Sequence, residues 1–330
     1  MRKFINDPAT FVTDYLRGLA AAHPGIIRYD EENRIVVRSD APVKGKVAVM
    51  SGGGSGCEPL HTGFVGPGML DAACPGQIYT SPVPNQIMAA TRAIDGGAGV
   101  LQVIKNFSGE VMNFGMAEEI LALEDMHVES ALVNDDVATK DSAGRRGLGG
   151  TLMVEKLAGA AAERSYDVAA VKQIAERVNA RVRSFGVGLS SCTPPDRGRP
   201  IYDMPADEMD LGIGISGEPG RERVPLRSAR DVAGLLVDEV TRDLGPARGA
   251  RLLVLVNGMG STPGSELYLL HGEIANALRS RGFNPCRAMV GSYVTALDQF
   301  GAALTLLEVD DELIELWDAP VHTAALRWGM

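Results

Sequence analysis

Short apolar runs alternate with helix-like stretches through the first half of the chain. Gly45–Met50, Gly99–Lys105 and Val128–Val133 are rich in β-branched residues, and each run is typical of a buried strand. Asn85–Ile94 and Met112–Leu123 lie between these runs and have the composition of helices. Each run ends in a polar loop. The pattern predicts an α/β architecture with a largely parallel sheet, whose polar loops converge at the carboxyl ends of the strands.

Two longer helices are predicted next, at Thr151–Arg164 and Val168–Arg183, where apolar residues recur three or four positions apart. The stretch Ser190–Met209 is polar and contains prolines, so it is a candidate domain junction or extended surface loop. Beyond it, a helix at Ala229–Asp243 and a strand at Arg251–Val256 indicate a second α/β unit.

The composition is that of a folded protein with about two domains. The chain has 330 residues, of which 45% are hydrophobic and 22% are charged. Its net charge of −10 argues against nucleic acid as a partner, because nucleic-acid binding depends on neutralised phosphates. The four cysteines have no CxxC spacing, so neither a zinc site nor a disulfide framework is indicated, and a reducing cytoplasm fits best.

Neither a leader nor a membrane anchor is expected. The N-terminal segment reads as an amphipathic helix, because Asp7, Asp14 and Arg17 interrupt its apolar positions, unlike those of a secretory signal. Nowhere does the sequence contain an uncharged apolar run of about 18 residues, as a membrane-spanning helix requires. We therefore expect a protein that does not bind membranes.

The 39 glycines gather in short clusters after apolar runs. The cluster Ser51–Cys57, SGGGSGC, follows a predicted strand, and its backbone could approach an anion or a polar ligand without interference from a Cβ atom. A tight turn explains the same residues equally well. The cluster lacks both the Gly-Lys-Ser/Thr ending of a Walker A loop and a GxGxxG fingerprint, so neither ATP nor NAD binding is indicated.

Three further segments carry candidate chemistry. Lys105–Glu110 offers a cation, an amide and a carboxylate that could grip hydroxyl groups, although an ordinary surface ion pair would look the same. Ser216 stands in a glycine-flanked turn, GIGISGEPG, which either presents it to a pocket or is merely flexible. Asn257–Thr262 resembles an anion nest before a helix whose first turn holds Glu266, and a capped helix start is the alternative.

The histidines give weaker signals. His61 lies near the first glycine cluster and His322 lies in the closing segment, and a lone histidine is more often structural than catalytic. The sequence contains no G-x-S-x-G elbow, no H-E-x-x-H helix and no metal-ligand spacing. Hydrolase and metal-site interpretations therefore gain no support.

A series of motifs carries a specific resemblance. SGGGSGCEPLHTGFVGPGML, TSPVPNQIMAA, IKNFSGEVMNF, LVNDDVA and GRRGLGGTLMVEKLAGAAAE follow one another in the first half. GIGISGEPG and VNGMGSTPGSELY follow in the second half, and LTLLEVDDELIELWDAPVHTAALRWG closes the series. From about Ile5 to Trp328, the chain resembles the substrate-binding subunit of the dihydroxyacetone kinase family.

The resemblance implies two α/β domains in each protomer of a homodimer. The first domain would span 1–183, with 315–330 returning to it, and the second would span 184–314. The family subunit binds no nucleotide, so no cofactor is expected on this chain. A separate helical subunit would carry the nucleotide and supply the phosphoryl group, and transfer would depend mainly on positioning and charge.

Members of the family hold a short ketose between the glycine-rich loop, a Lys-Asn-x-x-Gly-Asp loop and a histidine that forms a covalent hemiaminal with the ketone. Three of the expected catalytic positions differ here. Ser216 stands in place of the hemiaminal-forming histidine, and serine cannot form such a bond. Cys57 replaces the histidine assigned to acid–base work, and it would be reactive only as a thiolate. Glu110 replaces the aspartate and keeps a carboxylate suited to a general base.

The surrounding binding positions are kept. Gly54, Ser55 and Lys105 match the family unchanged, and Gly56 lies in the same loop. Together with Glu110, these residues are expected to bind a small hydroxylated ligand. Three hypotheses follow: a divergent kinase subunit without covalent capture, a non-catalytic sugar sensor or regulator, and a sugar-transforming enzyme that uses Cys57 and Glu110.

Overall fold

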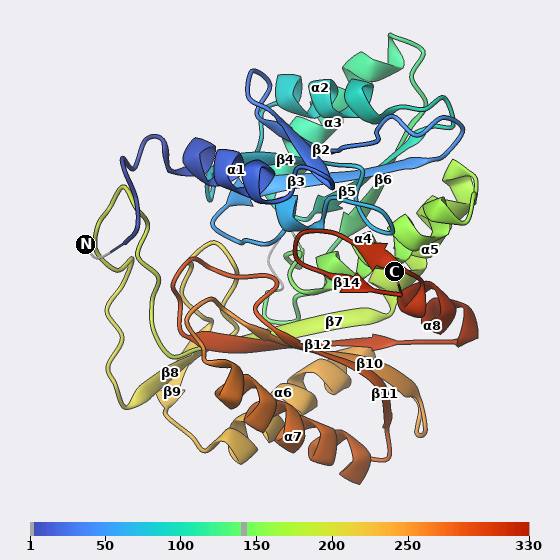
Figure 1. Cartoon of the computed structure of the whole chain (residues 1–330). Coiled ribbons are helices and arrows are strands. Elements are labelled where there is room, and N and C mark those ends of the chain that lie inside the picture. Colours follow the sequence, from blue (N-terminus) through green and yellow to red (C-terminus); the bar gives the residue numbers. More distant parts are fainter. Residues whose placement is uncertain (1–2, 140–143, 330) are drawn as a thin grey trace.

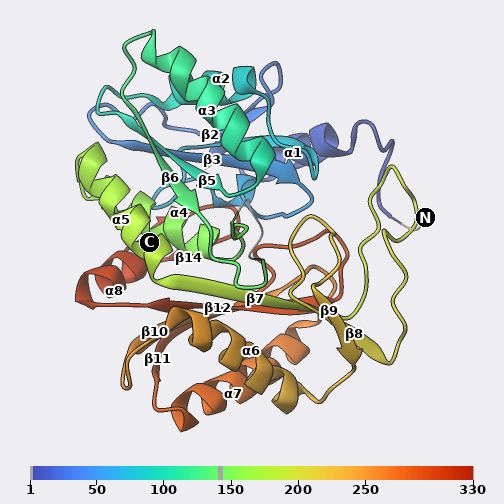
Figure 2. The ribbon, with the colours of Figure 1, turned by 180° about the vertical axis from the view of Figure 1, so that it is seen from behind.

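The computed structural model describes residues 3–139 and 144–329 and arranges them in alternating layers of helices and sheets (Figure 1). From one end of the molecule to the other, the layers are α2 with α3, a first sheet, α4 with α5, a second sheet, and α6 with α7. The view from behind shows the same succession (Figure 2). This layering confirms the predicted α/β class.

The first sheet has six strands in the order β1-β2-β4-β3-β5-β6. Strands β4, β3, β5 and β6 are parallel to one another, whereas β1 and β2 form an antiparallel extension at one edge. The strands span Ile27–Asp30, Ile35–Arg38, Ala48–Ser55, Ala72–Ile78, Val100–Lys105 and Val128–Val133 for β1 to β6 in turn. The parallel part places the carboxyl ends of β3, β4, β5 and β6 at one edge, where ligands collect in such sheets.

Helices cover both faces of this sheet. Helices α2 (Pro84–Ile94) and α3 (Ser108–Ala122) pack on one face, and α4 (Gly150–Glu163) and α5 (Val168–Ala180) lie on the other. Helix α4 is buried along nearly its whole length, because it lies between the two sheets. Most of its buried positions are apolar, as expected for a helix that is covered on all sides, although Glu155 and Lys156 are buried as well.

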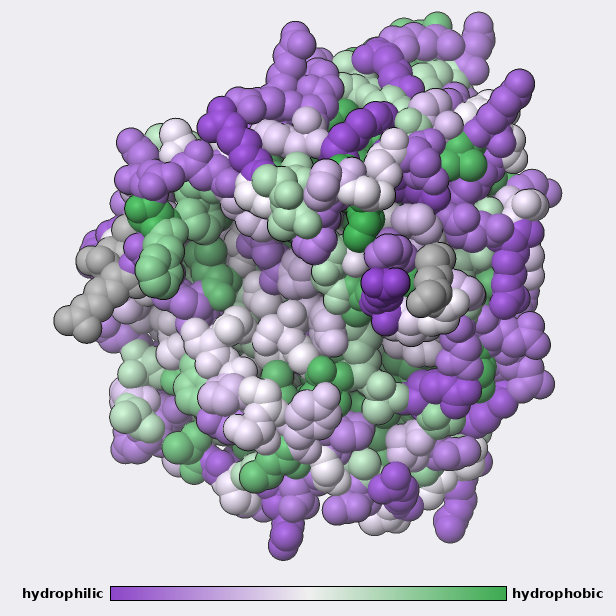
Figure 3. Space-filling model, in the orientation of Figure 1, coloured by the Kyte–Doolittle hydropathy of each residue, from purple (hydrophilic) through white to green (hydrophobic). Residues whose placement is uncertain are grey.

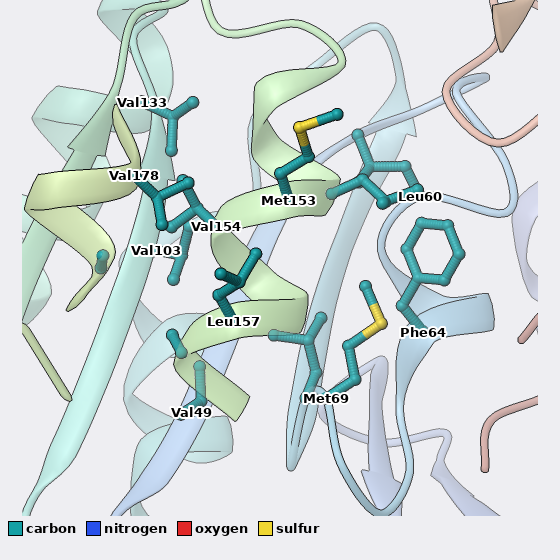
Figure 4. Packing of buried hydrophobic residues seen from close by; sticks show 14 of the residues in the cluster. Val49, Leu60, Phe64, Met69, Val103, Val133, Met153, Val154, Leu157 and Val178 are labelled. Carbon is teal, nitrogen blue, oxygen red and sulfur yellow. The ribbon is translucent and has the colours of Figure 1, made fainter. Parts of the chain in front are cut away.

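The largest core cluster surrounds α4. Figure 4 shows Met153, Val154 and Leu157 of this helix between side chains of the first sheet and those of the segment near Phe64 and Met69. The same cluster reaches side chains of the second sheet, including Leu253. The core therefore continues through α4 from one half of the chain to the other.

The second sheet also has six strands, in the order β11-β10-β12-β7-β8-β9, and all neighbours except β10 and β11 are antiparallel. Helices α6 (Ala229–Leu244) and α7 (Gly264–Ser280) cover its outer face with a separate apolar cluster. The strands span Val182–Gly188, Glu208–Leu211, Glu222–Pro225, Arg251–Gly258, Asn284–Gly291 and Gly301–Glu308 for β7 to β12 in turn.

The last segment returns to the first half of the chain. Helix α8 (Asp311–Asp318) packs against α4, and the short hairpin of β13 (Val321–His322) and β14 (Arg327–Trp328) follows it. The backbone N–H groups of His322 and Ala325 donate to the carbonyl oxygens of Pro67 and Gly63, both at 2.9 Å. The domain limits 1–183 with 315–330 and 184–314 stay a prediction.

Several predicted boundaries were wrong. Strand β3 continues through Ser55, so most of the glycine cluster is strand and not loop. Helix α3 begins at Ser108, four residues before its predicted start, and α5 ends at Ala180 because β7 begins at Val182. Helix α1 (Phe11–Ala22) forms at the N-terminal side, and a 3-10 turn, η1, spans Thr62–Phe64.

The surface is polar around its rim. On the face seen in Figure 3, hydrophilic residues dominate the outline, while paler and hydrophobic residues gather across the middle. Among the residues that the structure describes, none of the helices is long and apolar enough to cross a membrane.

Candidate functional site

A cavity of about 670 Å³ opens where the carboxyl ends of the parallel strands meet the second half of the chain. Its volume falls in the range typical of small-molecule sites. The walls come from the end of β3, the segments after β4 and β5, the first turn of α3, and a turn of the second half; the lining residues include Gly54, Cys57, Tyr79, Ser81, Lys105, Glu110, Arg146, Ser216 and Glu218. Segments far apart in the sequence therefore converge on one pocket.

Lys105 and Glu110 stand on either side of a strand-to-helix turn. Lys105 is the last residue of β5, and Glu110 lies in the first turn of α3, so the short connection brings both to the pocket. Both side chains are buried, with 2% and 6% of their surface exposed. Ser81 Oγ donates a hydrogen bond of 2.7 Å to Glu110 Oε2 and fixes the carboxylate. Both residues thus belong to a buried pocket, and the alternative of an ordinary ion pair on the surface does not apply to them.

Two more ionisable residues, His61 and Glu155, lie between Lys105 and the core. Lys105 Nζ lies 2.6 Å from His61 Nε2, and His61 Nδ1 lies 2.5 Å from Glu155 Oε1. Burial and the Lys105 cation lower the pKa of His61 well below its ordinary value, so its imidazole is neutral. Burial raises the pKa of the Glu155 carboxyl, and the Lys105 cation acts against this rise.

The glycines of β3 make room for these contacts. A Cβ atom on Gly53 would overlap Lys105 Nζ and would lie 3.2 Å from both Glu110 Oε1 and His61 Nε2. A Cβ atom on Gly54 would lie 2.6 Å from the backbone nitrogen of Thr80. The glycines are therefore needed for the close approach of the protein's own side chains and backbone in an extended strand, and the approach of a ligand to them stays a prediction.

Cys57 lines the pocket but is not set up as a nucleophile. It is 4% exposed, and its Sγ donates to the carbonyl oxygen of Ile215 at 3.2 Å. Burial raises the pKa of the thiol, and this effect outweighs the opposite influence of Lys105. The thiol therefore stays protonated at neutral pH, which is the inert state that burial was expected to produce.

Ser216 reaches the same pocket from the second half of the chain. Its backbone N–H donates to Glu218 Oε2 at 2.8 Å, and Glu218 Oε1 accepts from Arg146 at 2.7 Å. Arg146 also donates to Asp136 Oδ2 at 2.7 Å. Burial raises the pKa of Asp136 to about 6, with Arg146 opposing the shift. This network fixes the Ser216 turn against the first half.

Other predicted site residues have different surroundings. Ser55 Oγ donates to the carbonyl oxygen of Gly76 at 2.7 Å, and the Gly56 N–H donates to the Glu58 carboxylate at 3.0 Å. Neither residue is among those of the described chain that line the pocket. The segment Asn257–Thr262 lies elsewhere: Asn257 is in β10, and Thr262 lines a separate, mainly apolar cavity of about 300 Å³ together with Glu266.

Sequence reasoning missed several contributors. Glu155 lies in an apolar helical stretch, and a carboxylate in such a stretch indicates a functional or paired residue, because Glu is rarely buried without a partner. Tyr79 and Ser81 follow β4, a strand that was not predicted, and Arg146 and Glu218 gave no local signal. His61 was noted for its position but interpreted as structural. Among residues 3–139 and 144–329, no group of three or more His, Cys, Asp or Glu side chains is placed to hold a metal ion.

Comparison with known proteins identifies the family of the chain. The model of the Dak1 domain matches residues 17–325. The chain belongs to the Dak1 family. The match confirms the resemblance carried by the motifs, and it includes every residue described above at the pocket.

The relatives of this Dak1 protein include enzymes and a regulator. The dihydroxyacetone-binding subunit DhaK of the PEP-dependent dihydroxyacetone kinase of Escherichia coli (strain K12) is 42% identical, and the alignment covers 100% of both chains. The D-erythrulose kinase of Mycolicibacterium smegmatis is 40% identical over 100% of this chain and 57% of that protein. The structure of the dihydroxyacetone kinase operon co-activator Dha-DhaQ is similar with a TM-score of 0.89 and 30% identity, covering 94% of this chain and 96% of that one.

Proposed function

We propose that this chain is a divergent substrate-binding subunit of a dihydroxyacetone-kinase-type enzyme, which holds a small ketose or polyol for phosphorylation by a separate partner. The observation that carries this proposal is the placement of buried Lys105 and Glu110 in one pocket. A buried cation and a buried carboxylate are each costly to desolvate, and a polyhydroxylated ligand offers both of them hydrogen bonds. Relatives named for dihydroxyacetone binding and for erythrulose phosphorylation indicate the same ligand class.

The proposed chemistry uses the groups that remain. Lys105 donates to a ligand oxygen, and Glu110 accepts the proton of the ligand hydroxyl. As that proton leaves, the hydroxyl oxygen forms a bond to the phosphorus of the donor, and the bond to the donor's leaving oxygen breaks. No hemiaminal forms at position 216, because the serine side chain has no nitrogen. Cys57 has no proton-transfer role, since its buried thiol has a raised pKa.

The phosphoryl donor belongs to the partner in this proposal. We assign no cofactor to this chain and place the nucleotide on a helical kinase subunit. The sequence has no Walker A loop, and the Escherichia coli relative is itself named as one subunit of a kinase. The chain would act as a cytoplasmic homodimer, with neither nucleic acid nor a membrane as its partner.

Reconstitution tests this function. The purified chain is mixed with a helical donor subunit and its nucleotide, and trioses, tetroses and pentoses are supplied in turn while ³¹P NMR follows sugar phosphate. We expect at least one short ketose to be phosphorylated. Glu110→Gln keeps the shape of the side chain and should reduce the rate by about 10² or more, as for loss of a general base. Lack of transfer to every sugar contradicts a kinase role.

A sensor is the second candidate. Its motivation is the replacement of two family histidines by Cys57 and Ser216, together with the likeness to an operon co-activator. Calorimetry separates the two functions, because a sensor binds the sugar and a regulatory protein but supports no transfer with any donor. A third function, based on Cys57 as a nucleophile, is opposed by the buried and protonated thiol.

A further inference from the structure

Three ionisable side chains form a row that leads from the pocket into the core. Lys105 lines the pocket, His61 lies behind it just before η1, and Glu155 lies behind His61 on the buried helix α4. Their exposed fractions are 2%, 5% and 0%. The row therefore has one end that a ligand can reach and another that solvent cannot.

The two distances fix how protons can be placed in the row. The 2.6 Å contact joins Lys105 Nζ to His61 Nε2, and the 2.5 Å contact joins His61 Nδ1 to Glu155 Oε1. A neutral imidazole carries one N–H. If Lys105 is an ammonium, it donates to Nε2, and the Nδ1–H donates to the Glu155 carboxylate. In the second arrangement, one proton has moved from Lys105 to His61 Nε2 and another from His61 Nδ1 to Glu155. The protonated Glu155 then donates to Nδ1, and the Nε2–H donates to the neutral amine of Lys105.

Those two arrangements have the same net charge of zero. The row can therefore change Lys105 from ammonium to amine without leaving an uncompensated charge in the core, which would be costly. The neutral state of His61, favoured by its burial and by Lys105, is what both arrangements require. Among the described residues, Glu155 Oε2 has no hydrogen-bond partner within bonding distance, so the carboxylate's interaction with the row is concentrated on Oε1. Ser51 lies near the same carboxylate and, like Lys105, acts against the rise of its pKa.

Other groups face the row and belong to its electrostatics. Glu110 on α3 and Cys57 after β3 line the pocket beside Lys105, and Glu58 and Glu218 lie close enough to influence Cys57. The Cys57 thiol is protonated and carries no charge. Besides Glu155, the carboxylate to consider near Lys105 is therefore that of Glu110. Its fixed bond to Ser81 marks a separate role at the ligand.

We propose that Glu155 and His61 form a buried relay that sets the charge of Lys105: the carboxylate, acting through the imidazole, holds the lysine as an ammonium donor at the pocket and exchanges a proton with it. In the proposed function, on which this part rests, Lys105 is the residue that touches the ligand, and Glu155 and His61 are positioning residues. The relay goes beyond phosphoryl transfer, since it operates in the free protein and would serve a sensor equally well.

Competitive acetylation tests the relay in the full chain without any sugar. Trace acetic anhydride reacts with amines and not with ammonium groups, and mass spectrometry reports the labelling of each lysine against pH. In Glu155→Gln, the opposite charge that holds Lys105 as an ammonium is lost, so Lys105 should be labelled about tenfold faster than in the wild type at the same pH. Glu155→Asp restores the carboxylate and should recover part of the shift.

Glu163→Gln is the matched control. Glu163 stands on the same helix and the substitution removes the same charge, but its carboxylate pairs with Arg38 and not with His61. Labelling of Lys105 should follow the wild-type curve in this variant. Equal curves for wild-type and Glu155→Gln, or equal shifts in Glu155→Gln and Glu163→Gln, would overturn the relay.

A second measurement needs no substitution at Glu155 and so holds even if that variant fails to fold. Long-range ¹⁵N NMR of histidine-labelled protein, assigned with His61→Gln, reports the protonation of each ring nitrogen. We expect a neutral imidazole with its proton on Nδ1 between pH 6 and about 8. An imidazolium in this range would refute the relay. Absence of phosphoryl transfer changes none of these readouts, so failure of the proposed function is distinguishable.

Discussion

Alanine at Gly53 tests how far the pocket depends on the position of one ammonium group. The new Cβ atom would overlap Lys105 Nζ and would lie 3.2 Å from Glu110 Oε1 and His61 Nε2, so every near atom is the end of a side chain. Lys105 can move away, but it then loses its 2.6 Å contact with His61. A hydrogen bond that involves a charged group contributes about 1.5–3 kcal/mol. If the bond to the ligand weakens by a similar amount, affinity falls by about tenfold to a hundredfold.

Gly54→Ala is the matched comparison in the next position of β3. Its Cβ atom would lie 2.6 Å from the Thr80 nitrogen and 2.8 Å from the Tyr79 Cα atom, and both are backbone atoms. Backbone cannot move aside as a lysine side chain can, so we expect a larger loss of stability. Overpacking costs about 1–3 kcal/mol in general, with Gly53→Ala at the lower end and Gly54→Ala at or above the upper end.

Two assays separate these effects. Urea unfolding followed by circular dichroism should place the midpoint of Gly54→Ala below that of Gly53→Ala, with the wild-type midpoint highest. Calorimetry with dihydroxyacetone and with D-erythrulose should show weaker binding to Gly53→Ala although this variant stays folded. Wild-type affinity in Gly53→Ala for a sugar that the wild-type chain binds would refute the placement of Lys105 at the ligand.

Three further predictions concern other parts of the molecule. Burial lowers the pKa of Lys156 to about 7, so between about pH 7 and 10 the unfolded state binds one proton more than the folded state, and the free energy of unfolding rises with pH. Lys156→Met should remove about 1.4 kcal/mol per pH unit from the slope of the unfolding free energy against pH, and parallel plots for the two proteins would contradict this. Iodoacetamide at pH 8 should modify the partly exposed Cys286 well before the buried Cys57, as read by peptide mass spectrometry, and faster modification of Cys57 would show a reactive thiol. We expect the predicted homodimer to use the apolar face of α3, on which Met112 and Met116 are exposed. Met116→Glu should then shift the mass measured by light scattering toward that of a monomer, whereas an unchanged dimer would place the interface elsewhere.

Regular elements could be predicted from the sequence where local pattern and tertiary environment agree. β6 begins and ends at the predicted residues, and α2 differs by one residue, because an apolar run and a helix with proline in its first turn are local signals. The glycine cluster was misjudged for a physical reason. Glycine weakens a strand in general, but β3 accepts Gly52–Gly54 because Cys74, Tyr79 and Lys105 leave no space for side chains.

The composition of the pocket was harder to predict than its location. Lys105, Glu110, Cys57 and Ser216 were expected near one another, and the structure places all four at one cavity. Glu155 escaped notice because the sequence of α4 does not reveal that a second sheet covers its other side. A partner of this kind depends on long-range packing, which the local sequence pattern does not encode.

The returning segment after α8 also has a consequence for the order of events during synthesis. Lys156 Nζ on α4 donates to the carbonyl oxygen of Leu316, 160 residues later in the chain, and the hairpin that follows bonds to Gly63 and Pro67. At about 5–20 residues per second, a ribosome needs roughly 10–30 s to make the intervening chain. During that time the side of α4 that faces the second sheet and α8 lacks part of its native cover, whereas the first sheet can already cover the other side. Nascent chains of this protein should therefore need a chaperone, or slow folding of the first half, until the last segment emerges.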